Sequence, residues 1–183
     1  MKDWMRFMIP LGLLFVFQKV KAQYAAVPKI YDIVNSLPVH PNEVYGVRSL
    51  SQIQRIVIHH SDTLSGSAQA YAQYHIDQHG WPGIGYHFVI DKDGRINQTQ
   101  LLTTISYHVP GYNTSSVGIC LTGDFTQYPP TQAQIESVVY LVRFLSLTLG
   151  QKQVVGHGEL VTRTCPGDLI DVHQIETLAY SFT

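Results

Sequence analysis

An apolar run that ends in two histidines most constrains what this chain can fold into. Residues 53–60 are predicted to form a strand, because β-branched residues dominate the run just before the histidines. Apolar residues occur on both faces, which is typical of a central strand covered on both sides. Side chains alternate along a strand, so His59 and His60 are predicted to point to opposite faces. An undistorted strand can therefore bring only one of them to a given site.

A second histidine and a cysteine can complete a metal site with this strand. Residues 153–155 are predicted to form a short strand that runs into His157, and Cys165 follows eight residues later. Two imidazoles and one thiolate are the ligands of a catalytic zinc site, in which three protein ligands leave the fourth position open for water. The residues alone do not decide whether His59 or His60 is the first ligand.

The rest of the chain alternates predicted strands with predicted helices. Periodicity and caps predict helices at 66–79, 131–149 and around 172–180, and a short helix near 30–34. Further strands are expected at 86–90, 95–100 and 116–122. Residues 101–116 are expected to form a loop. This alternation predicts a single α/β (α+β) domain with a mixed central β-sheet flanked by helices.

The N-terminal segment, residues 1–23, is expected to be a signal peptide or an anchor. Lys2 and Arg6 precede an apolar run at 7–17 that is too short to span a membrane but suits a secretory signal. Cleavage after Ala22 or Gln23 would give an exported protein, periplasmic or extracellular, without a stable membrane span. The alternatives are an uncleaved anchor and a buried helix. Residues 24–50 are interpreted as a lead-in, and 51–183 as the main domain.

Composition excludes some classes of protein. Hydrophobic residues make up 45% of the chain and charged residues 14%, so a sizeable core is available. The net charge of −1 argues against a nucleic-acid partner, which normally requires a basic surface. Two cysteines permit one disulfide by count. However, Cys120 lies in an apolar run, which favours a buried free thiol.

With these motifs in place, the chain resembles the zinc-dependent N-acetylmuramoyl-L-alanine amidase family. That family includes phage lysozyme-type amidases and peptidoglycan recognition proteins. The ordered set of motifs covers roughly residues 50–170 and is far more specific than any one of them. The matching segments are residues 58–61, 83–88, 107–113, 116–120, 156–157 and 165–167. The resemblance implies a mixed sheet with helices around it and a zinc site in a substrate groove.

The resemblance also implies the metal ligands. The first histidine after the opening strand corresponds to His59, the histidine of the Gly-His motif to His157, and the cysteine of Cys-Pro-Gly to Cys165. His60, on the opposite face of the strand, is then expected to have a structural role.

Three further residues match family positions close to the zinc. Tyr86 is expected beside the zinc-bound water, although its pattern alone would indicate a half-buried strand tyrosine. His108 is expected near the metal, in contact with substrate. Arg163 suits an oxyanion, since it is always charged, but relatives often have Lys or Thr there. Position 122 also differs from some relatives, which have a catalytic glutamate where this chain has Thr122. Without that glutamate, the catalytic role is expected to fall to Tyr86.

Aromatic residues and a second histidine pair were also considered. Trp81 and Tyr112 are candidates to line the groove. His75 and His79 lie four residues apart on the predicted helix at 66–79, a spacing that can bind metal. No third ligand is evident near them, so a solvated or partly packed helix face is expected for both.

The implied reaction is zinc-dependent hydrolysis of the amide bond between N-acetylmuramic acid and L-alanine. The substrate is expected to be peptidoglycan or a muropeptide, and the enzyme to be a monomer. One alternative is a non-catalytic module that binds peptidoglycan. Another is a structural zinc domain, which normally has a fourth protein ligand.

Overall fold

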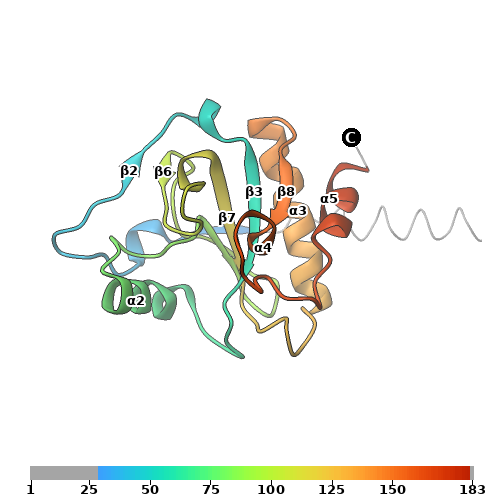
Figure 1. The fold of residues 1–183 in the computed structure, drawn as a ribbon, viewed down its shortest axis with the longest axis horizontal. Helices are drawn as coiled ribbons and strands as arrows, with labels where there is room; N and C mark the ends of the chain where they lie inside the picture. Colours follow the sequence, from blue (N-terminus) through green and yellow to red (C-terminus); the bar gives the residue numbers. More distant parts are fainter. Residues whose placement is uncertain (1–28, 182–183) are drawn as a thin grey trace, which may run out of the picture.

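A six-stranded mixed sheet forms the centre of the protein, whose computed structural model describes residues 29–181 (Figure 1). The strands follow the order β1-β5-β4-β7-β3-β8. Their bounds are β1 Ile30–Asp32, β3 Arg55–His60, β4 Phe88–Ile90, β5 Ile96–Gln98, β7 Ser116–Leu121 and β8 Gln153–Gly156. A separate antiparallel ribbon pairs β2 (Gly46–Val47) with β6 (Thr104–Ile105).

Helices cover both faces of this sheet. The α-helices are α2 Ala68–His79, α3 Gln132–Leu149, α4 His157–Leu160 and α5 Val172–Tyr180. The 3₁₀ helices are η1 Val34–Ser36, η2 Leu50–Gln52 and η3 Asn113–Ser115. Helices α3 and α5 pack over the main hydrophobic core on one face, and α2 lies on the other side of the sheet over a smaller core (Figure 1). The predicted α/β fold class is confirmed.

Strand β3 is central and buried on both faces, as its apolar pattern predicted. Ile56 and Ile58 point into the core beneath α3 and α5, whereas Val57 packs in a separate cluster on the opposite face. Alternation therefore places His60 on the α3 side and His59 on the other side. In the parallel register, His59 lies beside Cys120, which packs in the smaller core under α2.

Local signals explain why the long helices were predicted correctly. The Ser67 hydroxyl accepts a hydrogen bond from the Ala70 backbone N–H at the start of α2, and Gly80 ends that helix in the left-handed conformation with φ 64°. Thr131 and Gln134 form a reciprocal capping box at the start of α3. The predicted C-terminal helix matches α5.

The short helix predicted near residues 30–34 is wrong for residues 30–32, which form strand β1, and the 3₁₀ helix η1 begins only at Val34. Ile30 pairs with Ile96 in a parallel register, so β1 extends the edge of the sheet. The ring of Tyr31 lies 3.9 Å from the Arg95 guanidinium and 4.7 Å from the Lys29 ammonium, measured to the ring centroid. Long-range pairing and these cation–π contacts outweigh a helical spacing of only a few residues.

Three further features of the secondary structure differ from the predictions. Strand β4 begins at Phe88, so Tyr86 lies in the turn before it rather than in the strand. The predicted loop at 101–116 contains β6 and η3. The short helix α4, which begins at His157, was not predicted. Cys120 is buried and free, as expected from its apolar setting.

The predicted signal segment, residues 1–23, lies outside the described residues, so its cleavage and the lead-in boundary stay predictions. Between residues 29 and 181, no helix is both long enough and apolar enough to cross a membrane.

The core beneath α3 predicts a contrast between two leucines of that helix. Leu141 is fully buried, whereas Leu147 is 78% exposed. We expect Leu141→Ala to lower the free energy of unfolding by about 2–5 kcal/mol, because it leaves a cavity. Leu147→Ala should change it by less than about 0.5 kcal/mol. Urea denaturation of both variants checks this, and equal losses would contradict the packing described here.

Candidate metal centre and groove

Parallel strand pairing brings the first two candidate ligands together. In the register of β3 with β8, Ile58 lies beside Gly156, so the next residues, His59 and His157, emerge side by side. Parallel strands end at the same edge of a sheet, which explains why side chains almost one hundred residues apart meet there. The ring centroids of the two histidines are 4.7 Å apart.

Two glycines allow the cysteine loop to approach this edge. A Cβ atom on Gly156 would come within 2.9 Å of Pro166, and one on Gly158 would come within 2.4 Å of the Arg163 carbonyl oxygen. The Gly158 N–H donates a hydrogen bond of 2.6 Å to the Cys165 carbonyl. The loop after α4 therefore turns back over the strand ends, and this places the Cys165 thiol beside the two histidines.

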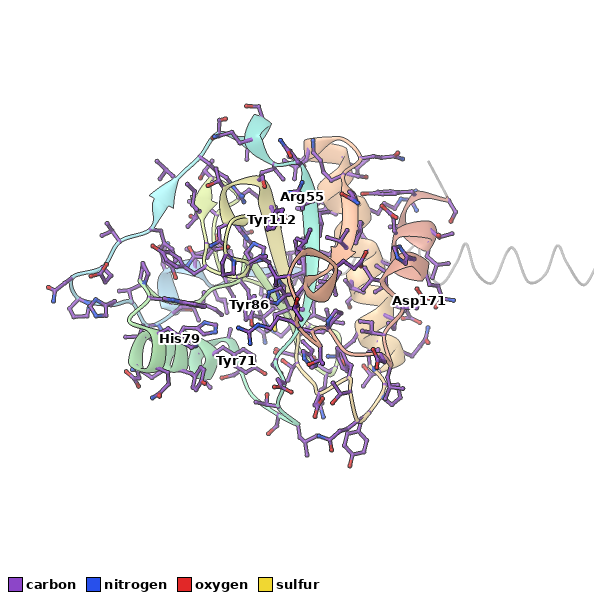
Figure 2. All side chains as sticks on the ribbon, in the orientation of Figure 1. Arg55, Tyr71, His79, Tyr86, Tyr112 and Asp171 are labelled. Atoms are coloured by element: carbon purple, nitrogen blue, oxygen red, sulfur yellow. The ribbon has the colours of Figure 1, made fainter. Side chains whose placement is uncertain are left out.

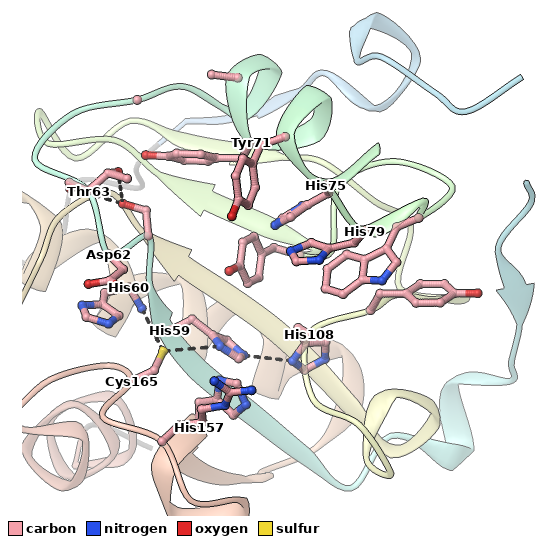
Figure 3. Close-up of a pocket in the computed structure, with 18 of the residues that line it drawn as sticks. His59, His60, Asp62, Thr63, Tyr71, His75, His79, His108, His157 and Cys165 are labelled. Carbon is pink, nitrogen blue, oxygen red and sulfur yellow. Dashed lines mark hydrogen bonds between the residues drawn. The ribbon is translucent and has the colours of Figure 1, made fainter. Parts of the chain in front are cut away.

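The three side chains converge on one point (Figure 3). Ligand atoms of His59, His157 and Cys165 all lie within 4.8 Å of one another. The Cys165 Sγ is 3.7 Å from the His59 Nδ1. Zinc–sulfur and zinc–nitrogen bonds at a tetrahedral angle would put these two atoms about 3.6 Å apart. The spacing therefore suits two ligands of one tetrahedral ion.

The donor atoms also have the chemistry of a metal site. The His157 Nε2 is buried and has no hydrogen-bond partner within residues 29–181. Burial lowers the pKa values of His59 and His157, and the charge of Arg163 lowers that of His157 further, so both rings are neutral. Burial raises the pKa of the Cys165 thiol to about 12. A bound metal would displace that proton, and the His60 N–H, 3.4 Å from the Cys165 Sγ, would stabilise the thiolate.

In a second cluster, formed by His60, Asp62 and Asp124, the His60 and Asp124 side chains already have partners within the protein. The His60 Nδ1 accepts a hydrogen bond from the Phe125 N–H and lies 3.9 Å from the Asp124 carboxylate. The same carboxylate oxygen accepts hydrogen bonds from the backbone N–H and the hydroxyl of Thr126. These bonds agree with the structural role expected for His60.

His108 contacts His59 through the ring nitrogen that faces away from Cys165. Its Nδ1 is 3.0 Å from the His59 Nε2, and its Nε2 is 3.2 Å from the Ser116 hydroxyl. A Cβ atom on Gly118 would come within 2.7 Å of the His108 ring, so only glycine leaves room for the ring. Both ring nitrogens of His108 therefore have partners within the protein, and its predicted contact with substrate stays a prediction.

An open groove of about 700 Å³ runs beside the three ligands, within the range of small-molecule sites. Ser61, Asp62 and Thr63 line it on the side of the β3 end, and Tyr71, Tyr74 and His75 line it from α2. A second hollow continues it beyond the metal site. The residues common to both hollows are His79, Trp81, Tyr107, His108, His157 and Arg163.

Tyr86 and Arg163 both line this groove. The ring centroids of Tyr86 and His59 are 5.3 Å apart. Burial raises the pKa of the Tyr86 hydroxyl well above its usual value, so the hydroxyl keeps its proton and can donate a hydrogen bond. Arg163 is exposed on the rim of the groove, and its charge acts on both His157 and Cys165.

The aromatic predictions had mixed outcomes. Trp81 lines the groove as predicted, and its ring centroid lies 4.6 Å from that of His79. Tyr112 does not: it packs against the cluster around Val57 and lies over the guanidinium of Arg55 at the opposite end of β3 (Figure 2).

The second histidine pair also differs partly from expectation. His79 is exposed, but His75 is buried and its Nδ1 accepts a hydrogen bond from the Gly85 N–H. Both residues line the groove, so this face of α2 forms one of its walls.

Arg48 is the residue that sequence reasoning missed. Only 6% of it is exposed, and it donates hydrogen bonds to four backbone carbonyls, while no carboxylate within residues 29–181 forms an ion pair with it. These carbonyls belong to Leu102, Asn113, Thr114 and Ser116, in and beside the loop that carries His108. Burial lowers the Arg48 pKa to about 10, which leaves it charged at neutral pH. No local pattern distinguishes this arginine from an exposed one.

Comparison with known proteins gives several relatives at about 30% identity. Human N-acetylmuramoyl-L-alanine amidase is 30% identical over 102 residues, which is 54% of this chain and 18% of that protein. Peptidoglycan-recognition protein 1 of Holotrichia diomphalia is 30% identical over 63% of this chain and 64% of its own length. The endolysin of Klebsiella phage KP32 is 31% identical over 57% of this chain and 72% of its own length. The match thus spans less than two thirds of the first two relatives.

Solved structures and a family model agree with these relatives. The endolysin N-acetylmuramoyl-L-alanine amidase LysCS from Clostridium intestinale URNW superposes with a TM-score of 0.71 at 28% identity, covering 84% of this chain and 96% of that one. The family model described as N-acetylmuramoyl-L-alanine amidase (Amidase_2) matches residues 49–168, a span that holds all three candidate ligands. The chain therefore belongs to the N-acetylmuramoyl-L-alanine amidase family.

Proposed function

We propose that this protein is a zinc-dependent N-acetylmuramoyl-L-alanine amidase that acts on peptidoglycan or muropeptides. The observation that supports this most directly is the convergence of His59, His157 and Cys165 beside an open groove. Two neutral imidazoles and one thiolate leave a dipositive ion with a net charge of +1, so it remains electrophilic. The three-ligand set also favours catalysis over a structural site, which normally has four protein ligands.

In the reaction, water would add to the carbonyl carbon of the lactyl group, and the C–N bond to L-alanine would break. A zinc ion held by the three ligands would lower the pKa of the attacking water and polarise the carbonyl. The products are a lactyl carboxylate on the sugar and a peptide with a free L-alanine amino group.

The residues around the ligands would stabilise the developing charge. The Tyr86 hydroxyl, which keeps its proton, can donate a hydrogen bond to the oxyanion. Arg163, which also lines the groove, adds a permanent positive charge and several donors. Thr122 accepts a hydrogen bond of 3.1 Å from the Tyr71 hydroxyl and offers no carboxylate, so the proposed group that stabilises the oxyanion from this side is the Tyr86 hydroxyl, as a hydrogen-bond donor.

The second candidate function is binding of peptidoglycan without cleavage, because the relatives include peptidoglycan-recognition proteins. The complete ligand set favours the enzyme, since binding alone does not require an open metal position. Export stays a prediction from residues 1–23.

The two cysteines provide a matched test of the metal site. We expect Cys165→Ala to lose high-affinity zinc binding, because it removes the only thiolate among the proposed ligands. Cys120→Ala changes the buried thiol outside the ligand set and should keep one zinc per chain. Metal content after dialysis, measured by mass spectrometry, decides this. Equal zinc content in both variants would disprove the assignment of Cys165.

Metal removal tests the reaction itself. The wild-type protein should release peptides that begin with L-alanine from purified sacculi, lose this activity with a chelator and regain it with zinc. His157→Ala should be inactive, whereas His173→Ala, whose side chain is 75% exposed, should remain active. Mass spectrometry of the released peptides is the measurement. Binding of sacculi without any such release would favour the recognition function.

Tyr86→Phe separates catalysis from metal binding. We expect turnover to fall by about 100-fold or more, because one donor to the oxyanion is lost. Zinc content should not change, since Tyr86 is not a ligand. Tyr128→Phe, at a tyrosine that is 58% exposed and does not line the groove, serves as the control. Wild-type turnover in Tyr86→Phe would remove this tyrosine from the mechanism.

A further inference from the structure

A chain of buried polar contacts leads from the metal site to the backbone. It runs from His59 through His108 to Ser116, and ends on the carbonyl oxygen of Tyr112. His59 is 1% exposed, His108 is 5% exposed and Ser116 is fully buried. Buried groups of this kind need defined partners, so the direction of each hydrogen bond can be worked out.

The direction follows from the metal ligand. The His59 Nδ1 faces the Cys165 sulfur, so it must be unprotonated to bind a metal. In a neutral ring the proton is then on Nε2, which can only donate to the His108 Nδ1, 3.0 Å away. His108 consequently carries its own proton on Nε2 and donates it to the Ser116 hydroxyl, 3.2 Å away. Figure 3 shows the first part of this chain.

The far end of the chain is held by the backbone. The Ser116 hydroxyl lies 2.7 Å from the Tyr112 carbonyl oxygen, which can only accept, so the hydroxyl must donate to it. Its remaining lone pairs face the His108 N–H. The buried Arg48 guanidinium donates a hydrogen bond of 2.6 Å to the backbone carbonyl of Ser116. The backbone N–H of His108 donates one of 2.9 Å to the side-chain oxygen of Asn113. These two hydrogen bonds hold His108 and Ser116 in position.

We propose that Ser116 is a positioning residue for the metal ligand His59, and that it acts through His108. Its hydroxyl selects the tautomer of His108 that accepts a hydrogen bond from His59, and so keeps the His59 Nδ1 free for the metal. This inference rests on the proposed metal site, but not on the identity of the substrate. Ligating histidines are commonly oriented by a partner on their other nitrogen, and loss of such a partner weakens metal binding by about 10–100-fold.

A neighbouring serine provides the matched control. Ser106 is also fully buried, and its hydroxyl lies 3.2 Å from the Nδ1 of another buried histidine, His87. Ser106→Ala therefore removes a serine–histidine contact of the same kind, and neither Ser106 nor His87 belongs to the series of hydrogen bonds that ends on His59. We expect Ser116→Ala to weaken zinc affinity by about 10–100-fold and Ser106→Ala by less than about 3-fold. Competition with a chromophoric chelator measures both dissociation constants.

A double-mutant cycle tests whether Ser116 acts through His108. A glutamine at position 108 can accept the His59 N–H without help from a serine. In the His108→Gln background, Ser116→Ala should therefore weaken zinc binding by less than about 3-fold. An undiminished effect in that background would overturn the proposal, as would equal effects of Ser116→Ala and Ser106→Ala.

Nitrogen NMR of the zinc-loaded wild-type protein tests the same point without a substitution. The ¹⁵N shifts distinguish protonated from unprotonated ring nitrogens, and we expect His108 to be protonated on Nε2 only. A proton on its Nδ1 would overturn the proposal even if the serine variants failed to fold. A wild-type protein that binds no zinc would instead refute the metal site, and one that binds zinc but cleaves nothing would refute the amidase function alone.

Discussion

The parallel pairing of β3 with β8 is the interaction on which the rest of the structure depends. It aligns Ile58 with Gly156, so the two histidines that follow emerge together at one edge of the sheet. The pairing of β3 with β7 on its other side adds the strand that starts at Ser116 and passes beneath His108. Functional side chains thus leave rigid strands, while loops supply the remaining ligand and the groove. The geometry of the site is a consequence of sheet register.

Burial gives these side chains their chemistry. Histidines surrounded by protein have lowered pKa values and remain neutral, which leaves lone pairs available for a metal. The same burial means that the His59 N–H needs a partner; His108 accepts it, and Ser116 in turn accepts from His108. Arg48, in contrast to these histidines, keeps its charge although it is buried. Its charge is stabilised by carbonyl oxygens rather than by a carboxylate, and in return it fixes the path of the loop that carries His108.

One strand serves two purposes because its side chains alternate. His60 points to the α3 side and accepts a hydrogen bond from the Phe125 N–H, whereas His59 points to the opposite face, where its ring centroid lies 4.7 Å from that of His157. Adjacent histidines of identical type therefore differ in environment and in proposed role. The groove continues past the metal site into a second hollow, and α2 forms one of its walls.

The sequence by itself determined the long helices, the buried central strand and the three residue types of the candidate site. These features depend on periodicity and caps within a few residues, and the family resemblance selected His59 over His60. The tertiary structure alone decided that residues 30–32 form an edge strand, that Tyr112 packs away from the groove, and that Arg48 holds the His108 loop. Each of these depends on a contact between residues far apart in the sequence: Ile30 pairs with Ile96, Tyr112 lies over Arg55, and Arg48 donates to the Ser116 carbonyl 68 residues away. A local pattern contains no information about which distant groups will meet.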